Sequence, residues 1–250
     1  WKICNEEITA DEIEVKYKFN EFRSLTTKLL SDEFICEPIN HHENDFLSVK
    51  FNSISKIEKL KIVNVLLGFQ RSFNIDDEKI KFHPSINKPS YLPASISWGE
   101  GIFLEFNFSE IDKWASLNKD FVETRNQVLN NRSKGSLQLR DVKNINYSLV
   151  HSFSHMLMKQ LAYESGFSVT ELTEKIYFFE DDQKVGLLIH TTSGDSQCSM
   201  GGLSDLADPN KLENIIKRAL TTNLSCSNDP LCADSHGQGT SSLSHAACFG

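Results

Sequence analysis

The sequence contains no long apolar stretch and no excess of basic residues. Its longest hydrophobic runs, such as residues 63–67 and 185–189, are far shorter than the roughly 18 residues that cross a bilayer. A transmembrane role is therefore excluded for this segment. The 26 basic and 34 acidic side chains give a formal charge of −8, which disfavours non-specific attraction to phosphate backbones and anionic membranes. Any contact with nucleic acid must be confined to a local patch.

Motifs of common enzyme classes are also missing. The sequence has no Gly-x-x-x-x-Gly-Lys-Ser/Thr loop and no Gly-x-Ser-x-Gly elbow. Its glycine pairs, at residues 99–101 and 201–202, are weak signals, because the first precedes a strand instead of joining a strand to a helix. We interpret Glu100 as a turn acid and Glu105 as an exposed strand residue. We therefore expect no nucleotide hydrolysis and no enzymatic activity.

The six cysteines do not form an even framework of the kind that disulfides build. Cys4, Cys36 and Cys198 are isolated, whereas Cys226, Cys232 and Cys248 fall within the last tenth of the chain. This distribution favours a reducing, cytoplasmic compartment. The chain begins with Trp1 and shows no leader pattern, so we interpret it as a fragment or processed chain and not as a secreted precursor.

Cys226, Cys232 and Cys248 offer three thiolates in a stretch that is too poor in apolar residues to fold alone. This setting is typical of a structural Zn²⁺ site. Three ligands are one short of the usual four. The fourth is either a residue beyond Gly250 or one of His236 and His245. Three reduced cysteines without metal are the alternative.

Hydrophobic periodicity predicts an α+β fold of mixed helices and short strands, followed by a cysteine-rich zinc-binding segment. Helices are expected over residues 12–30, 56–68, 109–128, 145–165, 168–172 and 209–220, and strands over 46–51, 101–108, 175–179 and 185–191. A long loop is expected over 74–97. These elements suggest a helical and loop-rich N-terminal part (1–98), an α+β core (99–220) and the zinc segment (221–250).

His151 and His155 lie one turn apart on the helix expected over residues 145–165. This spacing allows two imidazoles to bind one metal ion, but a zincin would need a glutamate where this chain has Ser152. The two histidines do not share the main apolar stripe of the helix, so we expect them to face a second layer or a cleft. We predict a structural or cleft-lining pair, and the alternative is a metal ligand or nucleic-acid contact.

One basic segment stands out in the acidic chain. Residues 130–144 contain Arg132, Lys134, Arg140 and Lys143 against a single acid, Asp141. We interpret the segment as an exposed connection. It is either the local patch for an anionic partner such as DNA or a solvated loop.

Several short strings, taken together and in order, resemble one protein family, the DrmB subunits of DISARM anti-phage systems. These subunits carry a module similar to the zinc-binding domain at the end of MrfA-type helicases. The strings are Leu67-Gly68-Phe69-Gln70-Arg71, Gly99-Glu100-Gly101-Ile102-Phe103 followed by Trp114, Val150-His151-Ser152-Phe153-Ser154-His155, Gly201-Gly202-Leu203, and Cys226-Ser227-Asn228-Asp229-Pro230-Leu231-Cys232 leading to Ala246-Ala247-Cys248. The resemblance begins near Leu60.

The resemblance implies a zinc-binding, non-catalytic partner of a separate helicase-like ATPase of the DrmA type, acting on DNA in bacterial defence. Cys226, Cys232 and Cys248 match three of the family's zinc cysteines, and the fourth would lie just past Gly250. At Phe249 the family often has histidine. Two functions remain open: an accessory subunit that helps a motor engage DNA, and a scaffold that binds only protein.

Overall fold

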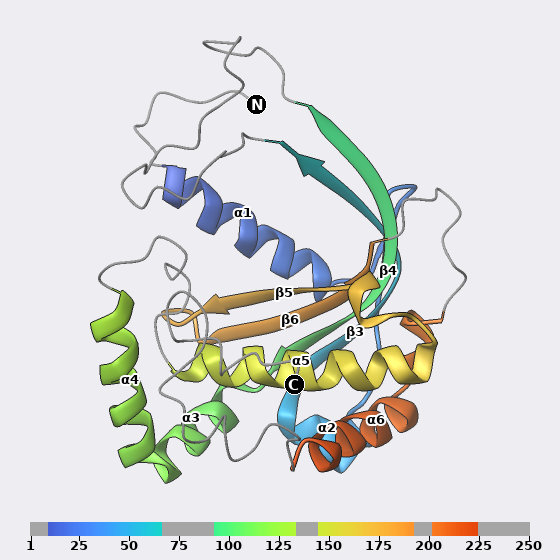
Figure 1. Ribbon diagram of the computed structural model, residues 1–250. Coiled ribbons are helices and arrows are strands. Elements are labelled where there is room, and N and C mark those ends of the chain that lie inside the picture. Colours follow the sequence, from blue (N-terminus) through green and yellow to red (C-terminus); the bar gives the residue numbers. More distant parts are fainter. Residues whose placement is uncertain (1–9, 67–92, 134–144, 193–201, 225–250) are drawn as a thin grey trace.

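The protein is built around one antiparallel sheet of six strands. The computed structural model describes residues 10–66, 93–133, 145–192 and 202–224 (Figure 1). The strands are β1 (Leu29–Leu30), β2 (Phe34–Pro38), β3 (Phe51–Val65), β4 (Ala94–Phe106), β5 (Leu172–Phe179) and β6 (Lys184–Thr191), in the spatial order β1-β2-β3-β4-β6-β5. The helices are α1 (Ala10–Leu25), α2 (Asp45–Lys50), α3 (Phe108–Leu117), α4 (Lys119–Ser133), α5 (Ile145–Ser165) and α6 (Pro209–Thr222), with short 3₁₀ turns η2 (Val169–Glu171) and η3 (Ser204–Ala207).

Helices cover both faces of the sheet. Figure 1 shows α1 on one side of β5 and β6 and α5 on the other, with α6 next to α5 and α2 next to α6. On the α1 face, Phe22 contacts Phe103 and Tyr177 edge to face, with ring centroids 5.5 and 6.0 Å apart. Such aromatic contacts add to the stabilisation that burial provides. Each strand alternates its side chains between the two faces of the sheet. The central strands contribute apolar side chains to both faces, with Phe103 on the α1 face and Ile102 and Leu104 on the other.

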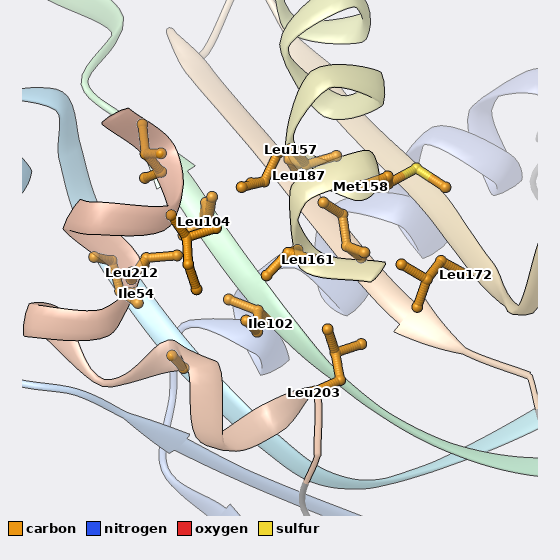
Figure 2. Packing of buried hydrophobic residues seen from close by; sticks show 14 of the residues in the cluster. Ile54, Ile102, Leu104, Leu157, Met158, Leu161, Leu172, Leu187, Leu203 and Leu212 are labelled. Atoms are coloured by element: carbon orange, nitrogen blue, oxygen red, sulfur yellow. The ribbon is translucent and has the colours of Figure 1, made fainter. Parts of the chain in front are cut away.

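The larger core lies between the sheet and helix α5. Leu157, Met158 and Leu161 of α5 belong to one buried cluster with strand residues, with Leu203, which precedes η3, and with Leu212 of α6 (Figure 2). The strand residues of this cluster include Ile54, Ile102, Leu104, Leu172 and Leu187. All of these side chains are almost completely buried. Burial of a side chain of this size contributes about 2 kcal/mol, so α5 is anchored firmly to the sheet.

The C-terminal half of the described chain follows the predicted elements closely. Helix α5 spans residues 145–165 as expected, and Gly166 follows it with a left-handed φ of 79°. Ser168 caps η2 through a complete capping box with Glu171. The hairpin of β5 and β6 pairs Phe179 with Lys184 across its turn, and Pro209 begins α6. These predictions are confirmed.

The predicted helix over residues 56–68 is wrong, because residues 51–65 form strand β3. The pairing of β3 with β4 shifts register between Ile57 and Leu60. Both residues therefore face the α1 side of the sheet although they are three positions apart. A bulge adds a residue to one strand, so a strand that contains one can imitate the apolar spacing of a helix.

The predicted strand over residues 46–51 is also wrong. Residues 45–50 form helix α2, and the side chain of Asn44 accepts a hydrogen bond from the backbone N–H of Leu47 at 2.9 Å. Asparagine is a favoured helix-capping residue, so Asn44 was the sequence signal for this helix. Similarly, Asn107 rather than Ser109 caps α3.

Several boundaries also differ from expectation. Helix α1 ends at Leu25, and residues 29–30 belong to the sheet. The boundary expected at residue 98 falls inside β4, and the N-terminal part, which was expected to be helical and loop-rich, supplies β1, β2 and β3. Strands β3 and β4, with 15 and 13 residues, are long rather than short. Among the described helices, none is long and apolar enough to cross a membrane.

Candidate functional site

Two histidines of helix α5 and one glutamate of strand β5 converge between the helix and the sheet. The Nε2 atom of His151 lies 2.8 Å from Oε1 of Glu174, and the Nε2 atom of His155 lies 3.0 Å from the same oxygen. The two imidazole rings meet nearly at right angles, with centroids 4.8 Å apart. We call His151, His155 and Glu174 the histidine–glutamate cluster.

The main core determines the position of this cluster. His151 and His155 are four residues apart and thus lie on one side of α5, while Leu157 and Leu161 of the same helix are buried against the sheet. On β5, Glu174 lies on the same face as Leu172 and Ile176, which also pack in that core. Helix and strand are therefore held in register by apolar contacts, and the three polar groups meet as a consequence.

Ser154 completes the surroundings of the glutamate. Its hydroxyl contacts Oε2 of Glu174 and also lies 2.7 Å from the backbone carbonyl of His151. A hydroxyl carries a single hydrogen, so it donates to one of these oxygens at a time. When it donates to Glu174, it fixes the carboxylate plane and directs Oε1 toward the imidazoles.

The electrostatic balance of the cluster favours an ionised carboxylate. Burial of Glu174 opposes its ionisation, but hydrogen bonds from His151, His155 and Ser154 outweigh burial and lower its pKa from 4.5 to about 2. The Glu174 side chain is 20% exposed, and those of His151 and His155 are 27% and 10% exposed. The cluster is thus screened from solvent on most sides and reachable mainly at His151.

Two chemical roles are open to this arrangement. If both Nε2 atoms carry hydrogens, they donate to Glu174, and the cluster ties α5 to β5. If the Nε2 atoms present their lone pairs instead, two imidazoles and a carboxylate form a ligand set for a metal ion. The ligand atoms of the three residues all lie within 4.8 Å of one another.

Sequence reasoning identified the histidines and missed the glutamate. The structure places both imidazoles over β5, and His155 is buried together with Leu157 and Leu161 of the same helix. Glu174 was overlooked because nothing in the sequence connects it with residues some twenty positions earlier. A signal did exist, since alternation along residues 172–176 places this acid between two apolar side chains that pack in the core.

A second buried carboxylate belongs to Glu100 of β4, and its expected role as a turn acid is wrong. Glu100 is only 2% exposed. Its Oε1 accepts the backbone N–H of Leu203 at 3.0 Å, and its Oε2 accepts the backbone N–H and the hydroxyl of Ser204 at 3.4 and 2.9 Å. The carboxylate therefore holds the start of η3 against the sheet.

The expectation for Glu105 is also wrong. This residue is 7% exposed, and its Oε1 accepts a hydrogen bond from Nζ of Lys184 at 3.1 Å. Both acids were expected at the surface because the predicted strand began only at residue 101, whereas β4 begins at Ala94. The sequence also did not show that β4 pairs with a strand on each side, β3 and β6. A strand in the middle of a sheet is covered on both faces, so its polar side chains need specific partners.

Of the other predicted site residues, Arg132 alone belongs to a described element. Arg132 lies in the last turn of α4, beyond the expected end of that helix, and its side chain is not described. The remaining cations of the basic segment, Lys134, Arg140 and Lys143, lie outside the described residues, as do Cys226, Cys232, Cys248, His236 and His245. Zinc binding and contact with DNA therefore stay predictions.

The comparisons with known proteins give one strong similarity. No family model matches the chain. The chain is 34% identical to the DISARM protein DrmB of Bacillus paralicheniformis, in an alignment that covers 98% of this chain and 44% of that protein. The chain thus spans less than half the length of the curated relative that it matches. The similarity to this DrmB protein extends along nearly the whole of the present chain.

Proposed function

We propose that this protein is a component of a DISARM anti-phage defence system and corresponds to part of a DrmB subunit. The observation that carries the proposal is the 34% identity to a DrmB protein over 98% of this chain. The short strings that resemble the family point to the same assignment. A component of such a system works together with other DISARM proteins.

The specific role that we propose is that of a zinc-binding, non-catalytic subunit that assists a helicase-like ATPase of the DrmA type in engaging DNA. Cys226, Cys232 and Cys248 would hold Zn²⁺ together with a fourth ligand. Three thiolates are a donor set that zinc prefers, which supports the assignment. Bound zinc would supply a structural cross-link in a polar segment.

Contact with DNA would involve the basic segment that contains Arg132, Lys134, Arg140 and Lys143. The alternative is a scaffold that binds protein partners without touching DNA, and the formal charge of −8 favours it. The two alternatives predict a different salt dependence of the affinity for DNA. Each phosphate contact made by a cation contributes about −0.9 to the slope of log affinity against log salt on duplex DNA.

The experiment that tests the defence role is a plating assay with phage on bacteria that carry the complete system. Deletion of the gene should restore phage plating, and the wild-type gene should suppress it again. If deletion leaves resistance intact, the proposal is wrong.

A second experiment tests contact with DNA. The affinity of the assembled complex for duplex DNA is measured at two salt concentrations, with and without replacement of the four cations by alanine. Equal affinity and slope for both complexes would favour the scaffold.

Metal analysis tests the cysteine site separately. Full-length protein purified without chelator should lose about one zinc ion per chain when Cys226 and Cys232 are replaced by serine. Cys198→Ser is the matched control and should retain the metal. The same preparations, freed of contaminating ATPases, should show no nucleotide hydrolysis without the motor. An unchanged zinc content would contradict the cysteine assignment.

A further inference from the structure

The histidine–glutamate cluster lies far along the chain from the cysteines and is unexplained by the proposed function. We propose that His151, His155 and Glu174 bind a divalent transition-metal ion between α5 and β5. This site is additional to the zinc site proposed at the cysteines and does not depend on the role in defence. Its existence rests on the positions of three side chains that the structure describes.

The distances between the ligand atoms fit an ion with little movement. Ligand atoms about 2 Å from a tetrahedral zinc ion lie about 3.3 Å from one another. In the cluster, the Nε2 atoms of His151 and His155 lie 2.8 and 3.0 Å from Oε1 of Glu174. These two distances are shorter than the tetrahedral value by about half an ångström or less, and the ligand atoms of all three residues lie within 4.8 Å of one another. Rotation of the imidazoles would make room for the ion.

The charge of the cluster also favours a cation. The residues that form ion pairs with Glu174, among those that the structure describes, are the two imidazoles, and no lysine or arginine reaches it. Its neighbour Lys175 points to the opposite face of the sheet and pairs with Glu21. A mostly buried carboxylate without a permanent cation is costly. A divalent ion held by the neutral imidazoles would compensate this charge.

The surroundings orient the ligands in the way that metal sites require. Ser154 contacts the second oxygen of Glu174, and hydrogen bonds of this kind commonly fix ligating carboxylates. His151 and His155 are held one above the other on a helix that the core anchors. The ligands are thus in place before an ion binds, which reduces the conformational entropy that binding must overcome.

The donor set indicates the class of metal. Two imidazole nitrogens and one carboxylate oxygen suit zinc, cobalt or ferrous iron, whereas magnesium and calcium prefer oxygen ligands alone. Three protein ligands leave at least one coordination position for water. The partly exposed side of His151 gives solvent access to that position.

The test uses full-length protein in which Cys226, Cys232 and Cys248 are replaced by serine, so that the thiolate site cannot contribute. Cobalt(II) is the probe, because its visible absorption reports nitrogen and oxygen coordination. We expect one cobalt ion per chain, displaced by zinc and not by magnesium. When Glu174→Gln or His155→Gln is introduced into this cysteine-free protein, the affinity for cobalt should fall at least about 100-fold.

Matched controls separate loss of a ligand from general damage. Glu164→Gln removes a carboxylate from the same helix, and His42→Gln removes an exposed imidazole; both should bind cobalt as before. Circular dichroism checks that each variant is folded. Should Glu174→Gln fail to fold, His151→Gln replaces it, since His151 is the most exposed of the three ligands. Absence of cobalt binding to the cysteine-free protein, or equal affinity in the ligand variants, would overturn the proposal.

Imidazole ¹⁵N spectra of the cysteine-free protein supply an independent measurement. A cluster held by hydrogen bonds alone requires hydrogens on both Nε2 atoms, whereas a metal ion requires their lone pairs. Zinc should therefore shift the Nε2 signals of His151 and His155 and leave that of His42 unchanged. No shift at either imidazole would also overturn the proposal. Failure here would leave the DISARM role untouched, since that role is tested by plating and by the cysteine variants.

Discussion

Two glutamates on the same face of the sheet, Glu100 fully buried and Glu174 mostly buried, are held in different ways. Glu100 accepts hydrogen bonds from two backbone N–H groups and one hydroxyl at the start of η3. Glu174 accepts hydrogen bonds from two imidazoles and one hydroxyl of α5. Both carboxylates join the sheet to an element that covers it. Their donors decide what else each carboxylate can do.

Backbone donors have no alternative chemistry, because an amide N–H can only donate. Glu100 is therefore suited to a purely structural role, in which it replaces the missing hydrogen-bond partners of a short turn. Imidazoles can instead change tautomer and present a lone pair to an ion. The comparison teaches that burial of an acid does not by itself indicate a functional site, and that the chemistry of its partners does.

The largest effect is expected from Glu100→Ala. The substitution leaves the backbone N–H groups of Leu203 and Ser204 buried without their acceptor and opens a small cavity. We expect the free energy of unfolding to fall by about 4 kcal/mol, measured by urea denaturation. Glu123→Gln, which changes an exposed acid on α4, should change it by less than about 0.5 kcal/mol. A loss of less than about 1 kcal/mol for Glu100→Ala would contradict the structural role of Glu100.

A somewhat smaller loss is expected from Gly99→Ala, next to Glu100. A Cβ atom at position 99 would lie 2.1 Å from the backbone oxygen of Thr191, so β4 and β6 must separate. We expect a loss of about 3 kcal/mol in the same denaturation experiment. Gly202→Ala is the matched control, because its Cβ would meet nothing closer than 3.5 Å. Equal stability of the two variants would show that the strands tolerate the added methyl group.

The third prediction contrasts the two glutamates directly. Glu174→Gln keeps the size of the side chain and an acceptor oxygen, so we expect a loss of about 1 kcal/mol without metal. The comparison with metal uses protein in which Cys226, Cys232 and Cys248 are replaced by serine. With metal bound the loss should be larger, because only the protein that retains Glu174 gains the full binding energy at the cluster. Glu100→Gln should show the same loss with and without metal. If, in the cysteine-free background, the stability of Glu174→Gln responded to zinc as that of the parent protein does, the contrast between the two glutamates would be contradicted.

The smallest effect concerns a histidine on the opposite face of the sheet. Burial lowers the pKa of His190 below 6.5, with Lys175 adding to the shift, while the carbonyl of Thr191 and Glu21 oppose it. The unfolded chain therefore takes up a proton at a higher pH than the folded protein does. His190 stabilises the fold fully above pH 6.5, and this contribution is lost as the pH falls through its folded pKa.

Urea denaturation at about pH 7.5 and about pH 5.5 measures this effect. His190→Asn keeps a donor for the carbonyl of Thr191 but removes the titrating group, so its stability should fall less between the two pH values. His42→Gln, at an exposed position, should follow the wild type. An identical fall in wild type and His190→Asn would show that other groups account for the pH dependence.

Local patterns predicted much of the second half of the chain. Helix α5, the hairpin of β5 and β6, η2 and α6 were found from periodicity and capping signals alone, because these signals lie within the segments themselves. Strand β3 was missed because its bulge imitates helical spacing, and α2 because a six-residue helix shows little periodicity. The pair His151 and His155 was found from its spacing, and Glu174 was not.

The amino-acid sequence by itself determined the acidic balance, the grouping of three cysteines, the histidine pair and the resemblance to DrmB, which depend only on order along the chain. Tertiary structure decided which acids are buried and what they contact. Glu100 meets Leu203 across 103 residues, and His155 meets Glu174 across 19. Such contacts depend on which strands pair and which helix covers them, and hydrophobic packing of the whole domain settles both.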